Sequence, residues 1–135
     1  MDEKIAQIIL SYYPDTQAIY IFGSYNTEYF SGDSDIDIAV LLPVETAKEI
    51  KSFVFTECYL SLRNILMKDI DLINIRDVST VFQKEIINSG KIIYIGDNNA
   101  LLEFEMLTIS FYQKLNEERK DILQNFYLTK RAYNV

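Results

Sequence analysis

Three aspartates stand at positions from which their carboxylates could act together on one substrate. Asp35 and Asp37 lie two residues apart at the start of the apolar segment IDIAVLL, which reads as a strand over residues 36–42. Side chains at i and i+2 of a strand point to one face, roughly 7 Å apart, so both carboxylates project together. Asp71 repeats this pattern within IDLINI, a second predicted strand over residues 70–75. If the two strands are neighbours, the three carboxylates converge on one patch.

Such a patch of carboxylates needs a compensating positive charge. Without one, the groups repel each other and are costly to remove from water. A divalent cation would supply that charge. The chain has no histidine and a single cysteine, so its ligands would be oxygen atoms, which suit Mg²⁺ or Mn²⁺ better than zinc. The lack of histidine also excludes Ser-His-Asp and Cys-His catalysis within the chain.

A glycine-serine pair supplies a second element of a candidate site. Gly23 and Ser24 directly follow AIYIF, a predicted short strand over residues 18–22, and precede a short predicted helix from Asn26 to Phe30. Glycine allows a phosphate to approach the backbone, Ser24 offers hydroxyl and N–H donors, and a helix N-terminus adds partial positive charge. A donor loop beside a metal-binding acidic patch is what a nucleoside triphosphate–Mg²⁺ complex requires. The chain contains no P-loop motif.

These motifs resemble a known family. Gly23-Ser24 and, ten residues further on, Asp35-Ile36-Asp37 look like the Gly-Ser…Asp-x-Asp signature of the polymerase-β-like nucleotidyltransferases. The short chain, SDIDIAV at residues 34–40, and the later Asp71 resemble the minimal nucleotidyltransferase (MNT) group. The resemblance is specific over about residues 19–42 and supportive to about residue 75. It implies a nucleotidyltransferase fold with a small mixed sheet, two Mg²⁺ ions, and transfer of a nucleoside monophosphate from a triphosphate.

Many small acidic members of this group are antitoxins encoded beside a HEPN-domain ribonuclease toxin. The resemblance therefore implies an antitoxin-type protein adenylyltransferase that moves AMP from ATP to a tyrosine hydroxyl of the toxin and neutralises it. On this hypothesis Asp35, Asp37 and Asp71 bind the metal ions and Asp71 accepts the hydroxyl proton, while Gly23 and Ser24 hold the phosphates.

Two other functions stay open. Many relatives carry Ala-Arg-Gly after Gly-Ser, whereas this chain has Tyr25-Asn26-Thr27-Glu28, without a cation. Charge stabilisation of the leaving pyrophosphate must then come from metal or from elsewhere, and a non-catalytic antitoxin that inhibits by binding is one alternative. Nucleotidyl transfer to a small molecule is the other.

The surrounding elements predict an α/β (α+β) fold in which helices flank a small sheet. Besides the three strands above, we predict a fourth strand over residues 91–95. The predicted helices cover residues 2–13, 46–67, 79–88 and 98 to about 127, with capping-box spacing at Thr46 and a cap at Ser79. We predict one domain over residues 1–135, with a core of about 1–97 and a C-terminal helical region over 98–135.

The C-terminal helix carries two neighbouring apolar stripes. One stripe contains Leu101, Phe104, Phe111, Leu115, Ile122 and Phe126, and the other contains Leu102, Met106, Ile109 and Tyr112. Either both stripes pack on the sheet, or one of them, or the end from Phe126 to Tyr133, docks on a partner protein.

Composition limits the remaining possibilities. The chain has 135 residues, a net charge of −7 and 49% hydrophobic residues. The acidity argues against direct binding of nucleic acid and fits a metal-chelated nucleotide or a basic protein partner. No apolar run reaches the roughly 18–20 residues of a membrane span, and we expect a cytoplasmic protein. Cys58, in an apolar helical stretch, is expected to be a buried thiol.

Overall fold

A four-stranded mixed sheet forms the centre of the protein, with helices on both faces. The computed structural model describes residues 1–23, 35–50, 52–54 and 56–133, with side chains described as far as residue 125. The strands are β1 (Ala18–Phe22), β2 (Ile36–Leu41), β3 (Ile70–Asn74) and β4 (Lys91–Ile95), arranged in the order β3-β2-β1-β4. β1 pairs antiparallel with β2 and β4, whereas β2 and β3 run parallel. The predicted fold class and all four strands are confirmed.

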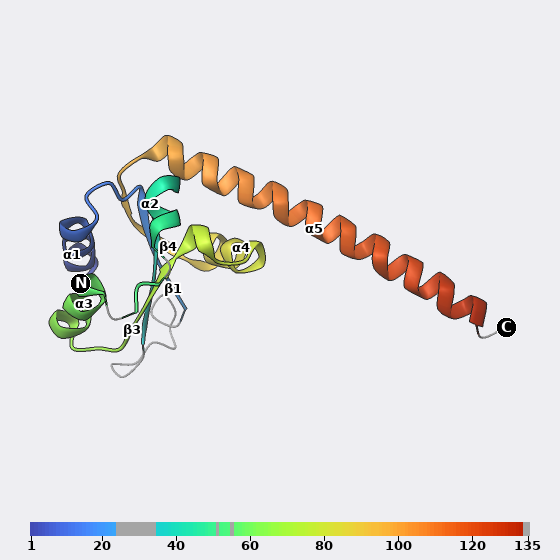
Figure 1. The fold of residues 1–135 in the computed structure, drawn as a ribbon, viewed down its shortest axis with the longest axis horizontal. Coiled ribbons are helices and arrows are strands. Elements are labelled where there is room, and N and C mark those ends of the chain that lie inside the picture. The colour runs from blue at the N-terminus through green and yellow to red at the C-terminus, as the bar shows by residue number, and fades with distance from the viewer. Residues whose placement is uncertain (24–34, 51, 55, 134–135) are drawn as a thin grey trace.

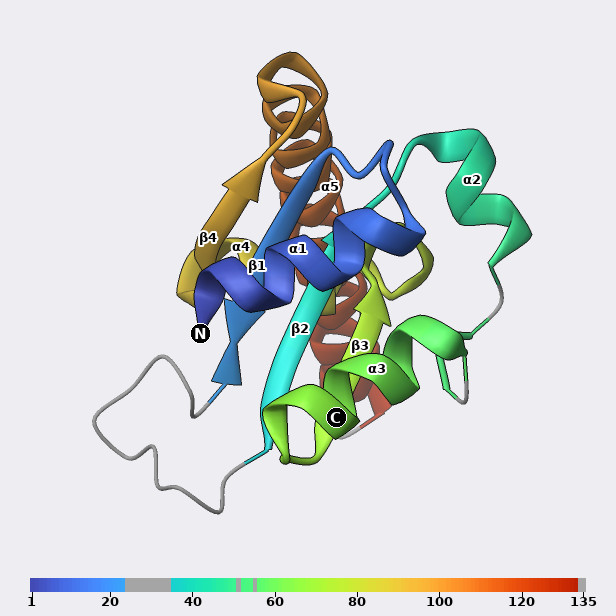
Figure 2. The same cartoon turned by 90° about the vertical axis from the view of Figure 1, so that its left-hand side faces the viewer.

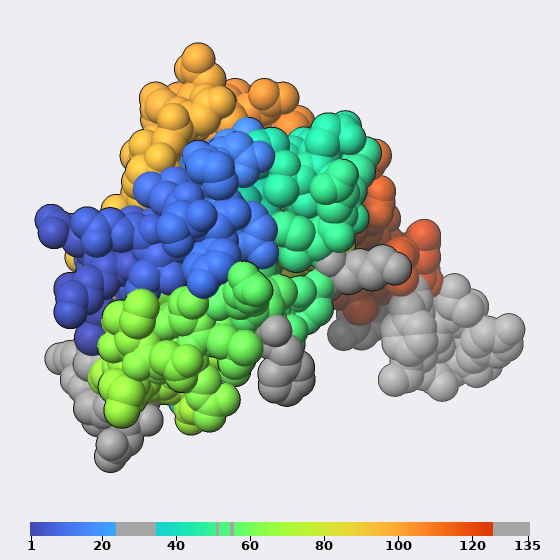
Figure 3. All heavy atoms as spheres, turned by 60° about the vertical axis from the view of Figure 1, so that its left-hand side comes forward, coloured from blue at the N-terminus to red at the C-terminus, as the bar shows by residue number. Residues whose placement is uncertain are grey.

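The helices are α1 (Asp2–Tyr12), α2 (Val44–Glu49), α3 (Glu57–Leu66), α4 (Thr80–Ser89) and α5 (Asn98–Tyr133), with a 3₁₀ turn, η2, at Ile75–Asp77. Figure 2 shows α1 and α3 in front of the strands and α5 behind them. In Figure 3 the residues of α1 lie against those of α3 on the near face, and the segment that follows α1 lies against α2. Within the described part of the chain, no helix combines the length and apolar character that a membrane span requires.

The predicted single helix over residues 46–67 is wrong, because this segment contains two helices. Pro43 precedes the first turn of α2, so Thr46 lies inside that helix and caps nothing. The backbone at Ile50 is extended and ends α2. The hydroxyl of Thr56 then accepts a hydrogen bond from the Tyr59 N–H and caps α3. The predicted cap at Ser79 is confirmed, since its hydroxyl accepts from the Phe82 N–H.

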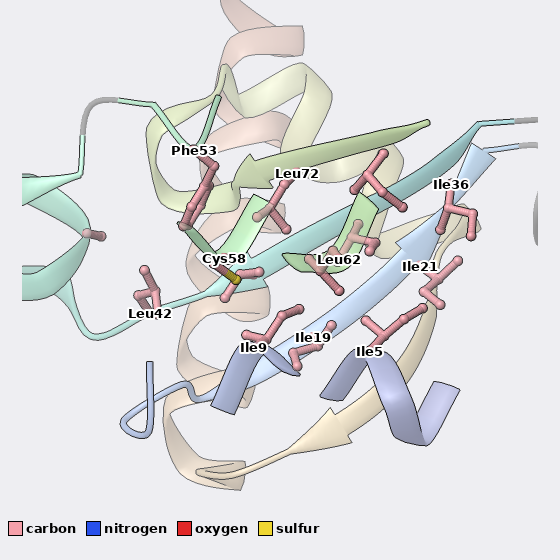
Figure 4. Close-up of a cluster of buried hydrophobic side chains, with 14 residues drawn as sticks. Ile5, Ile9, Ile19, Ile21, Ile36, Leu42, Phe53, Cys58, Leu62 and Leu72 are labelled. Atoms are coloured by element: carbon pink, nitrogen blue, oxygen red, sulfur yellow. The ribbon is translucent and has the colours of Figure 1, made fainter. Parts of the chain in front are cut away.

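Buried side chains form one hydrophobic cluster on each face of the sheet. The larger cluster, drawn in Figure 4, joins Ile5 and Ile9 of α1 and Leu62 of α3 to Ile19 and Ile21 of β1. Cys58 belongs to this cluster, and burial raises the pKa of its thiol to about 11. The predicted buried thiol is therefore confirmed.

The second cluster lies on the other face and attaches α4 and α5 to the sheet. Its members are Ala18, Tyr20, Ala39, Leu41, Ile75, Ile86, Leu101 and Phe104. The Tyr20 hydroxyl donates a 2.6 Å hydrogen bond to Glu105 Oε1, which adds a polar contact between β1 and α5. Only the first turns of α5 are held in this way, and Figure 1 shows the rest of the helix running away from the sheet.

The two apolar stripes of α5 therefore do not both pack on the sheet. In the first stripe Leu101 and Phe104 are buried, as is the neighbouring Thr108, but Phe111 and Ile122 are exposed. In the second stripe Leu102, Met106 and Ile109 are exposed.

Candidate active site

The three aspartates predicted from the sequence lie at one end of the sheet. Asp37 of β2 is the direct register partner of Asp71 of β3, and on its other side it faces Phe22 of β1. Register partners in a sheet share a face, so Phe22, Asp37 and Asp71 form a row across three strands. We call Asp37 and Asp71, together with the nearby Asp35, the acidic row. Asp35 precedes β2 by one residue and is exposed. The strands that carry Asp37 and Asp71 are thus neighbours, as the carboxylate hypothesis requires.

The row lies on the face of the sheet that α4 and α5 cover. Side chains alternate along β2, so Asp37 shares its face with Ala39 and Leu41. Both of these residues belong to the cluster that contains Leu101 and Phe104 of α5. At this end of the sheet the face becomes polar, because Asp37 and Asp71 replace the apolar side chains that the strands carry further along.

The electrostatic environment of Asp37 is unfavourable to its charge. Burial raises the pKa of this carboxyl above its usual range, and the negative charges of Asp71 and Asp35 raise the pKa further. Within the described residues, none of the three carboxylates takes part in a salt bridge. The site therefore carries uncompensated negative charge, which favours binding of a cation.

Gly23 lies against the Asp37 carboxylate. Its φ of +73° is in the left-handed region, where a side chain is strained, and a Cβ added there would overlap Asp37 Oδ2. Only glycine allows the backbone this close to the carboxylate. The structure thus brings Gly23 to the acidic row. Ser24 and the predicted helix from Asn26 to Phe30 lie outside the described residues.

The donor chemistry fits a hard divalent cation. All three side chains offer carboxylate oxygens, the ligands that Mg²⁺ and Mn²⁺ prefer. Among the described residues, no group of three or more acidic or cysteine side chains is placed so that it could hold a metal ion by itself. Magnesium in nucleotide sites is commonly held by one or two carboxylates together with substrate phosphates, so a complete protein cage is not required.

Phe22 is a site residue that the sequence analysis missed. Its ring is partly exposed and packs edge-on against the ring of Phe82 of α4, with 5.8 Å between the centroids. It places an aromatic side chain beside Asp37 in the sheet. Strand alternation alone does not indicate it, because its place beside Asp37 depends on the pairing of β1 with β2.

Comparison with known proteins gives consistent results. Residues 3–99 match the family model described as polymerase beta, nucleotidyltransferase. The chain is 34% identical over 124 residues to the protein adenylyltransferase MntA of Shewanella oneidensis, covering 92% of this chain and 86% of that protein.

Two solved structures are similar over most of their length. One is a toxin-antitoxin crystallised with AMP-PNP, with 33% identity, a TM-score of 0.70, and coverage of 92% of this chain and 96% of that one. The other is a tri-AMPylated Shewanella oneidensis HEPN toxin in complex with its MNT antitoxin, with 32% identity, a TM-score of 0.65, and coverage of 92% and 93%. This chain belongs to the polymerase beta nucleotidyltransferase family.

Proposed function

We propose that this chain transfers AMP from ATP to a tyrosine hydroxyl of a HEPN-domain toxin and thereby neutralises the toxin. The observation that carries the proposal is the pairing of Asp37 with Asp71 beside Gly23 on one face of the sheet. The relatives support the nucleotide and the partner, because one is a protein adenylyltransferase, one was solved with an ATP analogue, and one is bound to an AMP-modified HEPN toxin.

In this proposal Asp35, Asp37 and Asp71 hold Mg²⁺, and the expected number of ions is two. When bound, the metal would neutralise charge on the triphosphate and favour attack at its α-phosphorus. The backbone at Gly23 lets a phosphate approach Asp37 without a side chain between them. The Phe22 side chain lies on the same side of the site and limits the access of water to it.

The acceptor reaches the site from the open edge of this face. Asp71 is exposed, and in this proposal its carboxylate accepts the proton of the incoming tyrosine hydroxyl. The hydroxyl oxygen forms a bond to the α-phosphorus, and the bond from that phosphorus to the bridging oxygen breaks. Pyrophosphate leaves with the bridging oxygen. Because ATP is supplied in the cytoplasm, the proposed reaction takes place there.

Non-catalytic inhibition is the second candidate. It is favoured by Tyr25-Asn26-Thr27-Glu28, which supplies no cation after the glycine-serine pair. Both candidates predict a complex with the toxin, but only the first predicts a covalent change.

Intact-mass spectrometry of the HEPN protein from the source organism separates these candidates. The toxin is incubated with the chain, ATP and Mg²⁺, with and without a chelator. We expect a gain of AMP on tyrosine that disappears with Asp35→Asn, with Asp37→Asn and with the chelator. Asp77→Asn, an exposed aspartate beyond the far end of β3, serves as the matched control and retains transfer. Full transfer by both site variants would refute the proposal, and an inhibited but unmodified toxin would establish the second candidate.

A further inference from the structure

Beyond Thr108, α5 carries an apolar stripe whose described side chains include strongly exposed ones. At 1.5 Å per residue, the 36 residues of α5 extend about 54 Å, far beyond the sheet that its first turns contact. Figure 1 shows the helix passing α4 and continuing into open space. Isolated helices of this kind are marginally stable in water, and helices in proteins gain most of their stability from packing.

The stripe is a continuation of the buried one. Positions 104, 108, 111, 115 and 122 recur at spacings of three, four or seven residues, which places them on one side of a helix. Phe104 and Thr108 are buried against the sheet, whereas Phe111 is 56% exposed and Ile122 is 67% exposed. We call the residues Phe111, Leu115 and Ile122 the distal stripe.

A hollow lies at the start of the distal stripe. It has a volume of about 370 Å³ and separates α5 from η2, α2 and α4. Leu107 and Phe111 give it apolar walls, and Arg76 and Glu103 add polar groups. The Arg76 guanidinium is held in place by Gln17 Oε1 at 2.7 Å and by the ring of Phe104. A hollow with fixed polar groups beside an exposed aromatic ring suits an anchoring side chain from another protein.

Two observations bear on which protein would dock on this surface. The distal stripe and the acidic row belong to the same side of the sheet, because Asp37 shares its face with the cluster that attaches α5. A protein resting on α5 would therefore lie on the side where its hydroxyl must reach the carboxylates. A second copy of this chain is disfavoured, because each copy carries a net charge of −7.

We infer that the distal stripe of α5 and the hollow at its start form the docking surface for the HEPN toxin. The inference rests on the proposed function, since it adds the surface that delivers the acceptor to the acidic row. The contact is apolar: residues 111–125 contain three basic and three acidic side chains, so this segment has no net charge of its own.

The test is a binding measurement that does not depend on catalysis. The affinity of the full chain for the HEPN protein of its source organism is measured by calorimetry in an Asp37→Asn background, so that the toxin stays unmodified. The double variant Phe111→Glu with Ile122→Glu is expected to bind at least about 30-fold more weakly. The control is Ile65→Glu on α3, which lies on the opposite face and is 55% exposed. This control variant should bind the HEPN protein with the affinity of the parent.

Further measurements distinguish misfolding of the double variant, failure of the inference and failure of the proposed function. Circular dichroism, and ATP affinity with Asp37 intact, should be unchanged in the double variant, because its two positions are exposed and distant from the acidic row. If the double variant binds the toxin as tightly as the parent, or if the parent does not bind it, the inference is overturned. The inference is also overturned if the double variant still binds the toxin and loses only the association of the chain with a second copy of itself. If binding depends on the stripe but the intact chain transfers no AMP, the surface stands and the proposed function fails.

Discussion

Replacing Gly23 with alanine tests whether the contact of the backbone with Asp37 organises the site. The φ of +73° would strain an alanine by about 1–2 kcal/mol, and this strain lowers the free energy of unfolding. In addition, the new Cβ overlaps Asp37 Oδ2, so the carboxylate must move by about 1 Å to restore ordinary contact. A displacement of this size at a reacting centre costs on the order of 100-fold in rate. We therefore expect a folded but nearly inactive protein.

The assay is the initial rate of AMP transfer to the HEPN protein, with urea unfolding measured in parallel. Gly23→Asn is the matched variant, because asparagine tolerates left-handed backbone better than alanine but still carries a Cβ. It should recover part of the stability and none of the rate. Transfer by Gly23→Ala within about threefold of the parent would refute the argument that this glycine makes room for the carboxylate.

Three further predictions follow from individual residues. Asp37→Asn should lower the transfer rate at least about 100-fold. In the presence of a chelator, the same variant should nevertheless have a higher free energy of unfolding at pH 7. Because the pKa of Asp37 is raised in the folded protein, the stability contributed by its protonated form is lost as the pH rises from the ordinary pKa of 3.8 through the raised one. At pH 7 the charged carboxylate therefore destabilises the fold, and asparagine removes this charge. Urea titrations between pH 4 and 8 check this, and a less stable variant at pH 7 contradicts it. Met67 has φ +54° and is 85% exposed, so Met67→Gly should stabilise by about 0.5–1 kcal/mol; an unchanged or lower melting temperature would speak against backbone strain there. Cys58, with its pKa raised to about 11 by burial, should react with iodoacetamide at pH 8 at least about tenfold more slowly than in urea, and equal rates would contradict the burial.

The elements that the sequence predicted well have strong local signals. β1 and β4 match their predicted limits because short runs of β-branched and aromatic residues are bounded by turn residues. β2 and β3 each end one residue earlier than predicted, and at β3 the reason is that Ile75 begins η2. The break between α2 and α3 was missed, because Thr46 has the spacing of a capping box although Pro43 already occupies the position before the helix.

The acidic row was predictable as far as it depends on the alternation of side chains between the two faces of a strand. Alternation alone places Asp35 with Asp37, and a parallel neighbour places Asp71 beside them. The contact of Gly23 with Asp37 and the position of Phe22 beside Asp37 depend on the pairing of β1 with β2, which the local sequence does not specify. Likewise, the apolar stripes of α5 indicated burial but not where along the helix that burial ends.

Anomalous diffraction from crystals of the chain grown with Mn²⁺ and a non-hydrolysable ATP analogue tests the central claim most directly. We predict density for the cation in contact with the carboxylates of Asp35 and Asp37 and with the nucleotide phosphates, with the Asp71 carboxylate turned toward the same cation. Nucleotide bound elsewhere on the chain, or a cation that contacts none of the three aspartates, would contradict the account.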